Sequence, residues 1–208
     1  MAQLNKLFGT TKHPKKPLRQ PKKFVFKQQE PRIQIEKKST AQAHLSLAFP
    51  GPAYRAKDEL PAKLFSTILG GSMSSRLFIN IRERMGLCYY IGSNVSPYED
   101  QGAFAVFAGF DRTRIQDAIT AIVNEIRSIR DNGVTEEELT QAKEYIRGKM
   151  SIRMEDSENV AGFWGKQFLH AKQLRSQEEM SVALEKITVK DLKKFAQKYL
   201  KKEFANLV

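Results

Sequence analysis

The sequence predicts an α+β fold, in which helices pack against one face of a mainly antiparallel sheet. Segments that alternate apolar and polar residues, as strands do, lie mostly in the first half of the chain. Segments with apolar residues at helical spacing fill most of the chain after residue 113. This order differs from the regular alternation of strands and helices that builds a parallel sheet, and no internal repeat is found.

The composition is that of a globular protein with one domain, or one domain and a tail. The chain has 208 residues, 41% of them hydrophobic, which is long enough to bury a sizeable core. No apolar run reaches the ~20 residues that span a bilayer, and no secretory signal is recognisable. The single cysteine, Cys88, excludes an internal disulfide and fits a reducing compartment, so we expect a cytoplasmic protein without a membrane span.

Residues 1–23 are expected to be a basic tail or linker, and residues 24–208 the domain. The tail holds seven of the 35 Lys and Arg residues and none of the 23 Asp and Glu residues. Its prolines and lysines predict a disordered or extended segment. Such a tail can bind nucleic acid or an anionic membrane without specificity, but a solvated linker explains it as well. The domain shows no nucleic-acid-binding motif, so we expect no specific nucleic acid partner.

The first half of the domain predicts strands and one helix. Residues 32–36 alternate as a half-buried strand does, and residues 43–49 repeat the pattern up to a Pro-Gly-Pro turn. Residues 58–69 have apolar side chains at helical spacing and predict a helix. Residues 102–109 predict another strand, which is apolar on both faces and is therefore expected at the centre of the sheet.

The second half of the domain predicts mainly helices. A stripe of isoleucines predicts a helix over residues 115–129, and the capping box Thr135-x-x-Glu138 opens the next helix. Three further elements are expected: a helix that begins at Ser157 or Asn159, a helix from Thr188, and a final edge strand over residues 204–208.

One stretch near the middle of the chain carries the most distinctive pattern. It begins with Gly70, Gly71 and Ser72, small residues that suit a tight turn. A short amphipathic helix is predicted from Leu77. Gly86 stands where a glycine in the left-handed conformation ends a helix, and a strand follows it.

Arg82 and Tyr89 lie on either side of this glycine. Because the chain reverses at Gly86, a guanidinium at the helix end and a phenol in the strand can point into one space. Both groups are donors, and two convergent donors can hold a peptide carbonyl and the oxyanion that forms from it. A structural role is open too: Arg82 can favour the negative end of its helix, and Tyr89 can be a half-buried strand aromatic.

The motif resembles the second half of pitrilysin/insulinase-type zinc peptidases, most closely the branch of the mitochondrial processing peptidase and its bacterial relatives. That family typically reads Leu-Gly-Gly-Gly-Met-Ser-Ser-Arg-Leu-Phe and then Arg-Glu-x-x-Gly-Leu-x-Tyr. This chain has both parts in order, with Ser72 in place of the third glycine. The resemblance runs from about Phe24 to the C-terminus and implies the α+β layout of one half of a clam-shell molecule.

The resemblance also implies roles for particular residues. Arg82 matches the family's substrate-binding arginine, and Tyr89 matches its tyrosine that contacts the substrate carbonyl near the metal. Gly70, Gly71 and Ser72 match the flexible glycine-rich segment, which we expect to be a substrate-binding loop.

The zinc ligands of the family are missing from this sequence. The family signature is His-x-x-Glu-His on a helix, where the histidines bind zinc and the glutamate is the general base. The three histidines, His13, His44 and His170, are far apart in sequence, and each is expected at the surface or at a helix end. The resemblance therefore implies that zinc belongs to an N-terminal half, in the same polypeptide or a separate subunit, and we expect no cofactor in this chain.

Two functions remain as hypotheses. The first is the C-terminal, substrate-closing domain of a zinc endopeptidase, which would bind a peptide together with the zinc-bearing half and be inactive alone. The second is a non-catalytic structural or partner subunit of the same fold, in a homo- or hetero-oligomer. The presence of both Arg82 and Tyr89 favours the first, because an inactive scaffold has no need of these donors.

Overall fold

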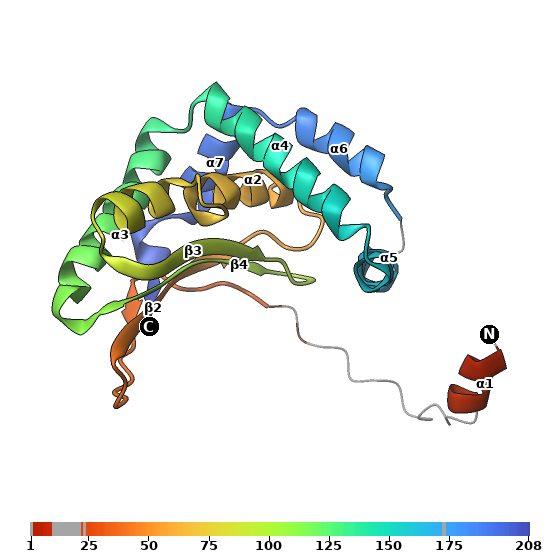
Figure 1. Ribbon diagram of the computed structural model, residues 1–208, viewed down its shortest axis with the longest axis horizontal. Helices are drawn as coiled ribbons and strands as arrows, with labels where there is room; N and C mark the ends of the chain where they lie inside the picture. The colour runs from red at the N-terminus through yellow and green to blue at the C-terminus, as the bar shows by residue number, and fades with distance from the viewer. Residues whose placement is uncertain (1, 10–21, 23, 172–173) are drawn as a thin grey trace.

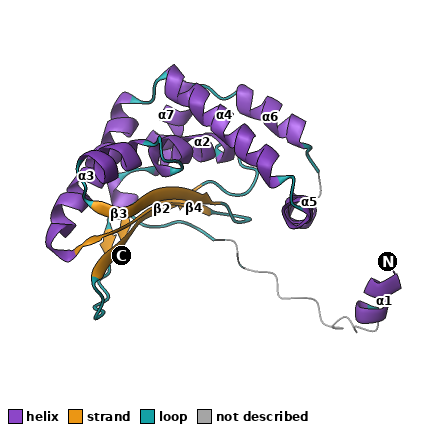
Figure 2. Cartoon of the chain, viewed as in Figure 1, coloured by secondary structure: helices purple, strands orange, loops and turns teal. Residues whose placement is uncertain are grey.

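A computed structural model describes residues 2–9, 22, 24–171 and 174–208. It contains one five-stranded sheet with helices layered on one face, so the predicted α+β class is confirmed (Figures 1 and 2). No described helix covers the opposite face of the sheet, which we call the open face (Figure 1). Among the described helices, none is long and apolar enough to cross a membrane.

Three long antiparallel strands form the body of the sheet, and two short strands extend one side of it. Their bounds are β1 (Arg32–Ile33), β2 (Gln42–Gly51), β3 (Cys88–Ser96), β4 (Gly102–Asp111) and β5 (Asn206–Leu207). The order across the sheet is β1-β5-β2-β4-β3, in which only β1 and β5 pair in parallel. β4 therefore lies between β2 and β3, as its apolar residues on both faces predict.

Two strand predictions are wrong in part. Instead of a half-buried strand over residues 32–36, only Arg32 and Ile33 pair, and the side chains of Ile33 and Ile35 are exposed. The alternation is right for a strand, but no described element covers this side of the sheet. β5 is not an edge strand, because β1 pairs with the side of β5 that faces away from β2.

The helical layer follows the predicted apolar stripes. Its members are α2 (Glu59–Gly70), α3 (Ile115–Asn132), α4 (Glu136–Arg153), α6 (Gln177–Glu185) and α7 (Val189–Tyr199). α5 (Ser157–Ala171) stands apart from this layer, near the tip of the β3–β4 hairpin (Figure 1). The predictions do not include α6, although the capping box Ser176-x-x-Glu179 marks its start. Short helical turns complete the described elements: η1 (Phe78–Arg84), η2 (Arg112–Arg114) and η3 (Lys202–Phe204).

The start of the chain also differs from the prediction. Residues Ala2–Phe8 form the helix α1, where a disordered or extended tail is expected. These residues precede the first proline and include leucine, glutamine and lysine, which favour helix. The prolines on which the prediction depends, Pro14, Pro17 and Pro21, lie outside the described residues.

Three phenylalanine rings hold the helices to the sheet. Phe65 of α2, Phe104 of β4 and Phe195 of α7 are all fully buried, with ring centroids 5.3 to 6.1 Å apart. Inclined ring pairs of this kind stabilise a core beyond the apolar area that they bury. The cluster therefore places α2 and α7 on the same face of β4.

An ion pair ties the segment after α2 to α4. The Nε and Nη2 atoms of Arg76 donate to the two carboxylate oxygens of Glu138 at 2.5 and 2.7 Å. The same carboxylate accepts the N–H of Thr135 at 2.8 Å, which completes the predicted capping box of α4. Burial raises the pKa of Glu138, but the hydrogen bonds from Arg76 and Thr135 outweigh burial and hold this pKa below its ordinary value.

We expect Phe195→Ala to lower the free energy of unfolding by about 3–5 kcal/mol, because it leaves a cavity among the three rings. Phe168→Ala is the matched control, since the Phe168 ring on α5 is 69% exposed, and it should change stability by no more than about 0.5 kcal/mol. Urea unfolding measures both. Equal losses in the two variants would contradict the assigned core.

We expect Glu138→Gln to destabilise the protein by about 1–3 kcal/mol at pH 7, because it removes the negative charge that pairs with Arg76, although a glutamine can still accept the Thr135 N–H of the capping box. Since the folded pKa of Glu138 is depressed, this stabilisation is complete above the unfolded pKa and is lost as the pH falls through the folded pKa. The difference from the parent should therefore shrink below about pH 4.5. Glu137→Gln, an exposed change in the same helical turn, is the control, and a pH-independent difference would refute the assignment.

Candidate functional site

Arg82 is carried by a π-helix rather than by the predicted α-helix. In η1 the N–H of Met85 donates to the carbonyl of Asn80, five residues back, at 3.2 Å. π-Helices are rare in proteins as a whole, but those that occur are often found at functional sites. Three apolar residues at helical spacing, Leu77, Phe78 and Ile81, predict this element; Leu77 and Ile81 are fully buried, whereas Phe78 is only partly buried. The side chain of Arg82 is exposed.

Gly86 ends this helix in the predicted way. Its φ of +57° lies in the left-handed region, which glycine adopts easily and which is unfavourable for residues with a Cβ atom. The reversal lets β3 begin at Cys88, on the buried side of the sheet. Arg82 and Tyr89 are thus placed on either side of a short turn, as the sequence predicts.

A β-bulge turns Tyr89 away from the core. Cys88 pairs with Phe110 and Tyr90 pairs with Gly109, so Tyr89 is an extra residue on β3. An extra residue breaks the alternation of the strand and re-aims the side chains around it. Tyr89 and Tyr90 are both exposed as a result, at 56% and 41%.

The two predicted donors are near in sequence but are not joined to each other. The Arg82 guanidinium carbon lies 4.6 Å from the centre of the Phe78 ring, a cation–π contact within η1. No hydrogen bond among the described residues uses the Arg82 guanidinium or the Tyr89 hydroxyl. Both groups are therefore free to donate to a ligand.

Packing against β3 explains why the first residue of the glycine-rich loop, Gly70, is a glycine. A Cβ on Gly70 would lie 2.7 Å from the backbone nitrogen of Ser93 and 2.9 Å from the carbonyl carbon of Gly92. α2 therefore ends in direct contact with the backbone of β3, which only glycine permits. Gly71 then donates its N–H to the carbonyl of Thr67 at 3.2 Å and closes α2.

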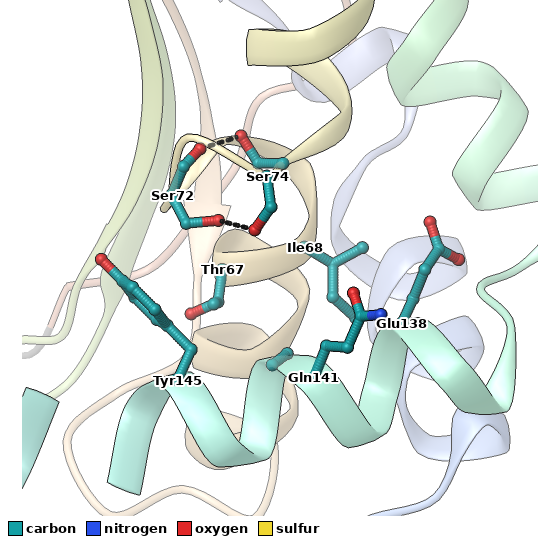
Figure 3. Close-up of a pocket in the computed structure, with 9 residues that line it drawn as sticks. Thr67, Ile68, Ser72, Ser74, Glu138, Gln141 and Tyr145 are labelled. Carbon is teal, nitrogen blue, oxygen red and sulfur yellow. Dashed lines mark hydrogen bonds between the residues drawn. The ribbon is translucent and has the colours of Figure 1, made fainter. Parts of the chain in front are cut away.

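The rest of the loop is held by short-range hydrogen bonds and by α4 (Figure 3). The hydroxyls of Ser72 and Ser74 are 3.0 Å apart, and the Ser75 hydroxyl donates to the Ser72 carbonyl at 2.6 Å. From α4, the Tyr145 hydroxyl donates to the carbonyl of Gly71 at 3.2 Å. A pocket of about 40 Å³ lies between the loop and α4 and is large enough only for a few water molecules.

The two described histidines, His44 and His170, lie on different elements and have different partners. His44 of β2 has its Nδ1 2.9 Å from the Tyr90 hydroxyl, and His170 of α5 has its Nδ1 3.9 Å from a carboxylate oxygen of Glu99. His13 lies outside the described residues. In the described ranges no group of three His, Cys, Asp or Glu side chains could hold a metal ion. The described residues therefore offer no ligand set for zinc, the metal that the resemblance assigns to a separate N-terminal half.

Three residues near the predicted site were not singled out from the sequence. Arg76 lies within the motif and pairs with Glu138 of α4. The sequence marks Glu138 only as part of the capping box with Thr135, so it does not reveal that Glu138 also binds Arg76. Tyr90 and Phe107 lie together on the open face of the sheet, with ring centroids 6.4 Å apart. A bulge decides on which face Tyr90 lies, and no sequence signal marks that bulge.

Comparisons with known proteins agree with this structure. The family profile described as the peptidase M16 inactive domain matches residues 1–146. An uncharacterised zinc protease of Streptomyces coelicolor is 30% identical over 169 residues, which are 81% of this chain and 37% of that protein. The chain thus spans less than half of that relative.

Solved structures give the same fold at lower identity. A protease from Helicobacter pylori matches with a TM-score of 0.87 and 22% identity, over 98% of this chain and 50% of that one. The peptidase M16 inactive domain from Pseudomonas fluorescens matches with a TM-score of 0.74 and 22% identity, over 86% of this chain and 42% of that one. This chain therefore belongs to the peptidase M16 family, as a copy of its inactive, C-terminal domain.

Proposed function

We propose that this chain is the substrate-closing domain of a zinc endopeptidase and supplies Arg82 and Tyr89 as donors to the peptide. The proposal depends on one observation, the exposure of these two side chains with their polar groups unpaired in the described structure. Both are exposed beside one turn, and neither polar group is used by a hydrogen bond within the described structure. Tyr89 has no partner residue on β4 and is 56% exposed, which argues against a structural role as a half-buried strand residue.

The donors suit a carbonyl that gains negative charge. A guanidinium carries a permanent positive charge and a phenol donates one hydrogen bond, so both interact more strongly with an oxyanion than with a neutral carbonyl. An interaction that strengthens in the transition state accelerates the reaction, whereas equal binding of substrate and transition state does not. Arg82 and Tyr89 therefore contribute to rate rather than only to affinity.

In this proposal the glycine-rich loop meets the peptide through Ser72. Gly70 is committed to its contact with β3, and Gly71 is committed to closing α2. Ser72 is the first residue of the segment that is free of both tasks. The loop then acts as a fixed wall rather than a hinge, because Tyr145 and Glu138 of α4 hold its two ends.

The proposal requires a second half that bears the zinc. The curated relative is named a zinc protease and is more than twice as long as the part that this chain matches. That half would supply the metal and the general base, either on the same polypeptide or as a separate subunit. This chain alone is expected to show no peptidase activity.

We expect Arg82→Ala and Tyr89→Phe each to lower kcat/KM about 10²–10³-fold when the chain is combined with its zinc-bearing half, because each removes one donor to the oxyanion. Arg127→Ala and Tyr98→Phe remove an exposed arginine and an exposed tyrosine elsewhere and should leave the rate unchanged. Cleavage of a fluorogenic peptide measures the rate, and size-exclusion chromatography checks that each variant still forms the complex.

The same assay identifies the competing role. A complex that forms normally, with a rate insensitive to Arg82→Ala and Tyr89→Phe, would show a scaffold or partner subunit instead. Zinc and peptidase activity in the isolated chain would overturn the proposed division between the two halves.

A further inference from the structure

The open face of the sheet carries two aromatic rings that the proposed function leaves unused. Tyr90 of β3 and Phe107 of β4 are 41% and 39% exposed, and their rings are inclined at 39° with centroids 6.4 Å apart. We call these two rings the aromatic platform. Tyr89, one of the two proposed donors, is the residue next to Tyr90.

Glycines opposite the rings let the platform lie flat on the sheet. Tyr90 is directly opposite Gly109, and Phe107 is directly opposite Gly92. A Cβ on Gly109 would lie 2.4 Å from Cε1 of Tyr90, and a Cβ on Gly92 would lie 2.7 Å from Cζ of Phe107. Each ring therefore covers the backbone of its neighbouring strand, and any larger residue there would lift it.

His44 holds the Tyr90 ring in this position. His44, Gly109 and Tyr90 form one row across β2, β4 and β3, so the Tyr90 side chain reaches over Gly109 toward His44. Its hydroxyl is 2.9 Å from Nδ1 of His44, and the two rings are nearly parallel at 29°. The polar end of Tyr90 is thereby satisfied, and its ring face remains available for an apolar contact.

The size of the platform points to a side chain rather than a docked helix. Apart from the two rings and Pro50, the open face is small or polar along the three long strands; its other members include Ser46, Ala48, Asn94, Ala103 and Ala105. A docked helix needs a broad apolar stripe, and a stable protein interface buries roughly 1,000 Å² or more. Two rings instead match the contact area of one large side chain.

We propose that the aromatic platform is a subsite for an aromatic or large aliphatic side chain of the peptide substrate. This inference rests on the proposed function, because the occupant is the peptide whose carbonyl Arg82 and Tyr89 hold. The bulge at Tyr89 leaves both Tyr89 and Tyr90 exposed. A peptide held at Tyr89 therefore places a neighbouring side chain over Tyr90 and Phe107. Offset or edge-to-face stacking on the rings then favours that residue over a small one.

Binding to the chain alone gives the first test. Three capped hexapeptides that differ only by Phe, Ala or Lys at one central position are titrated, and amide shifts are followed by NMR. The Phe peptide should move the amides of Tyr90, Gly92 and Gly109, and the Ala peptide should not. Tyr90→Ala combined with Phe107→Ala should abolish the shifts, while Tyr98→Ala at the hairpin tip should keep them. Equal shifts with Phe and Ala, or larger shifts with Lys, would overturn the proposal.

Cleavage by the complete complex gives the second test and separates this inference from the proposed function. Arg82→Ala should slow the Phe and Ala peptides alike, whereas Tyr90→Ala should lower the ratio of their kcat/KM values about tenfold or more. His44→Ala keeps both rings and should lower the ratio less. An unchanged ratio in Tyr90→Ala would reject the subsite even if Arg82 proves essential. An insensitive Arg82 would reject the proposed function, and the NMR titration would still decide on the platform.

Discussion

The arrangement of the candidate site depends on the burial of one face of β4. The rings of Phe65, Phe104 and Phe195 fix α2 and α7 on that face, and the strand period of two then assigns the side chains of β2, β4 and the part of β3 beyond its bulge to a face. Apolar residues that face α2 and α7 enter the core. The remaining residues form the open face, where Tyr90 and Phe107 lie. A slip of one residue would exchange the two sets, so the core determines what the open face presents.

Against this regular background, the irregular elements are concentrated in one short segment. A π-helix, a left-handed glycine and a β-bulge follow one another from Phe78 to Tyr90. Each of these irregularities interrupts the regular spacing of side chains along a helix or strand. Their combination exposes Arg82 and Tyr89 while Ile81 and Cys88 on the same segment remain in the core. Such departures from regular geometry are where binding residues are commonly placed.

The glycine-rich segment is fixed in the fold by contacts that serve stability. Gly70 permits α2 to touch the backbone of β3, and Arg76 binds Glu138 at the start of α4. Both contacts would be needed in a protein with no substrate. Because they hold the two ends of the segment, they also leave Ser72 in a defined place. Substitutions in this motif therefore need a stability measurement beside any measurement of activity.

Local chemistry determined much of this protein, and the sequence alone was sufficient to predict that part. Alternating residues predicted β2 and β4, apolar stripes predicted α2, α3 and α4, and a long ordered motif indicated the family. These signals lie within a few residues of one another along the chain. Gly86 was also predictable, because a glycine after an amphipathic helix has one usual conformation.

Tertiary structure decided the features that depend on residues far apart in sequence. Residues 32–36 alternate like a buried strand, yet Ile33 and Ile35 are exposed because no described element covers them. The partner of Arg76 is 62 residues away, and the partner of the Tyr90 hydroxyl is 46 residues away. The bulge at Tyr89 exists only through the register of β3 on β4. Strand pairing and side-chain packing determine these features, so they cannot be predicted from the pattern of neighbouring residues in the sequence.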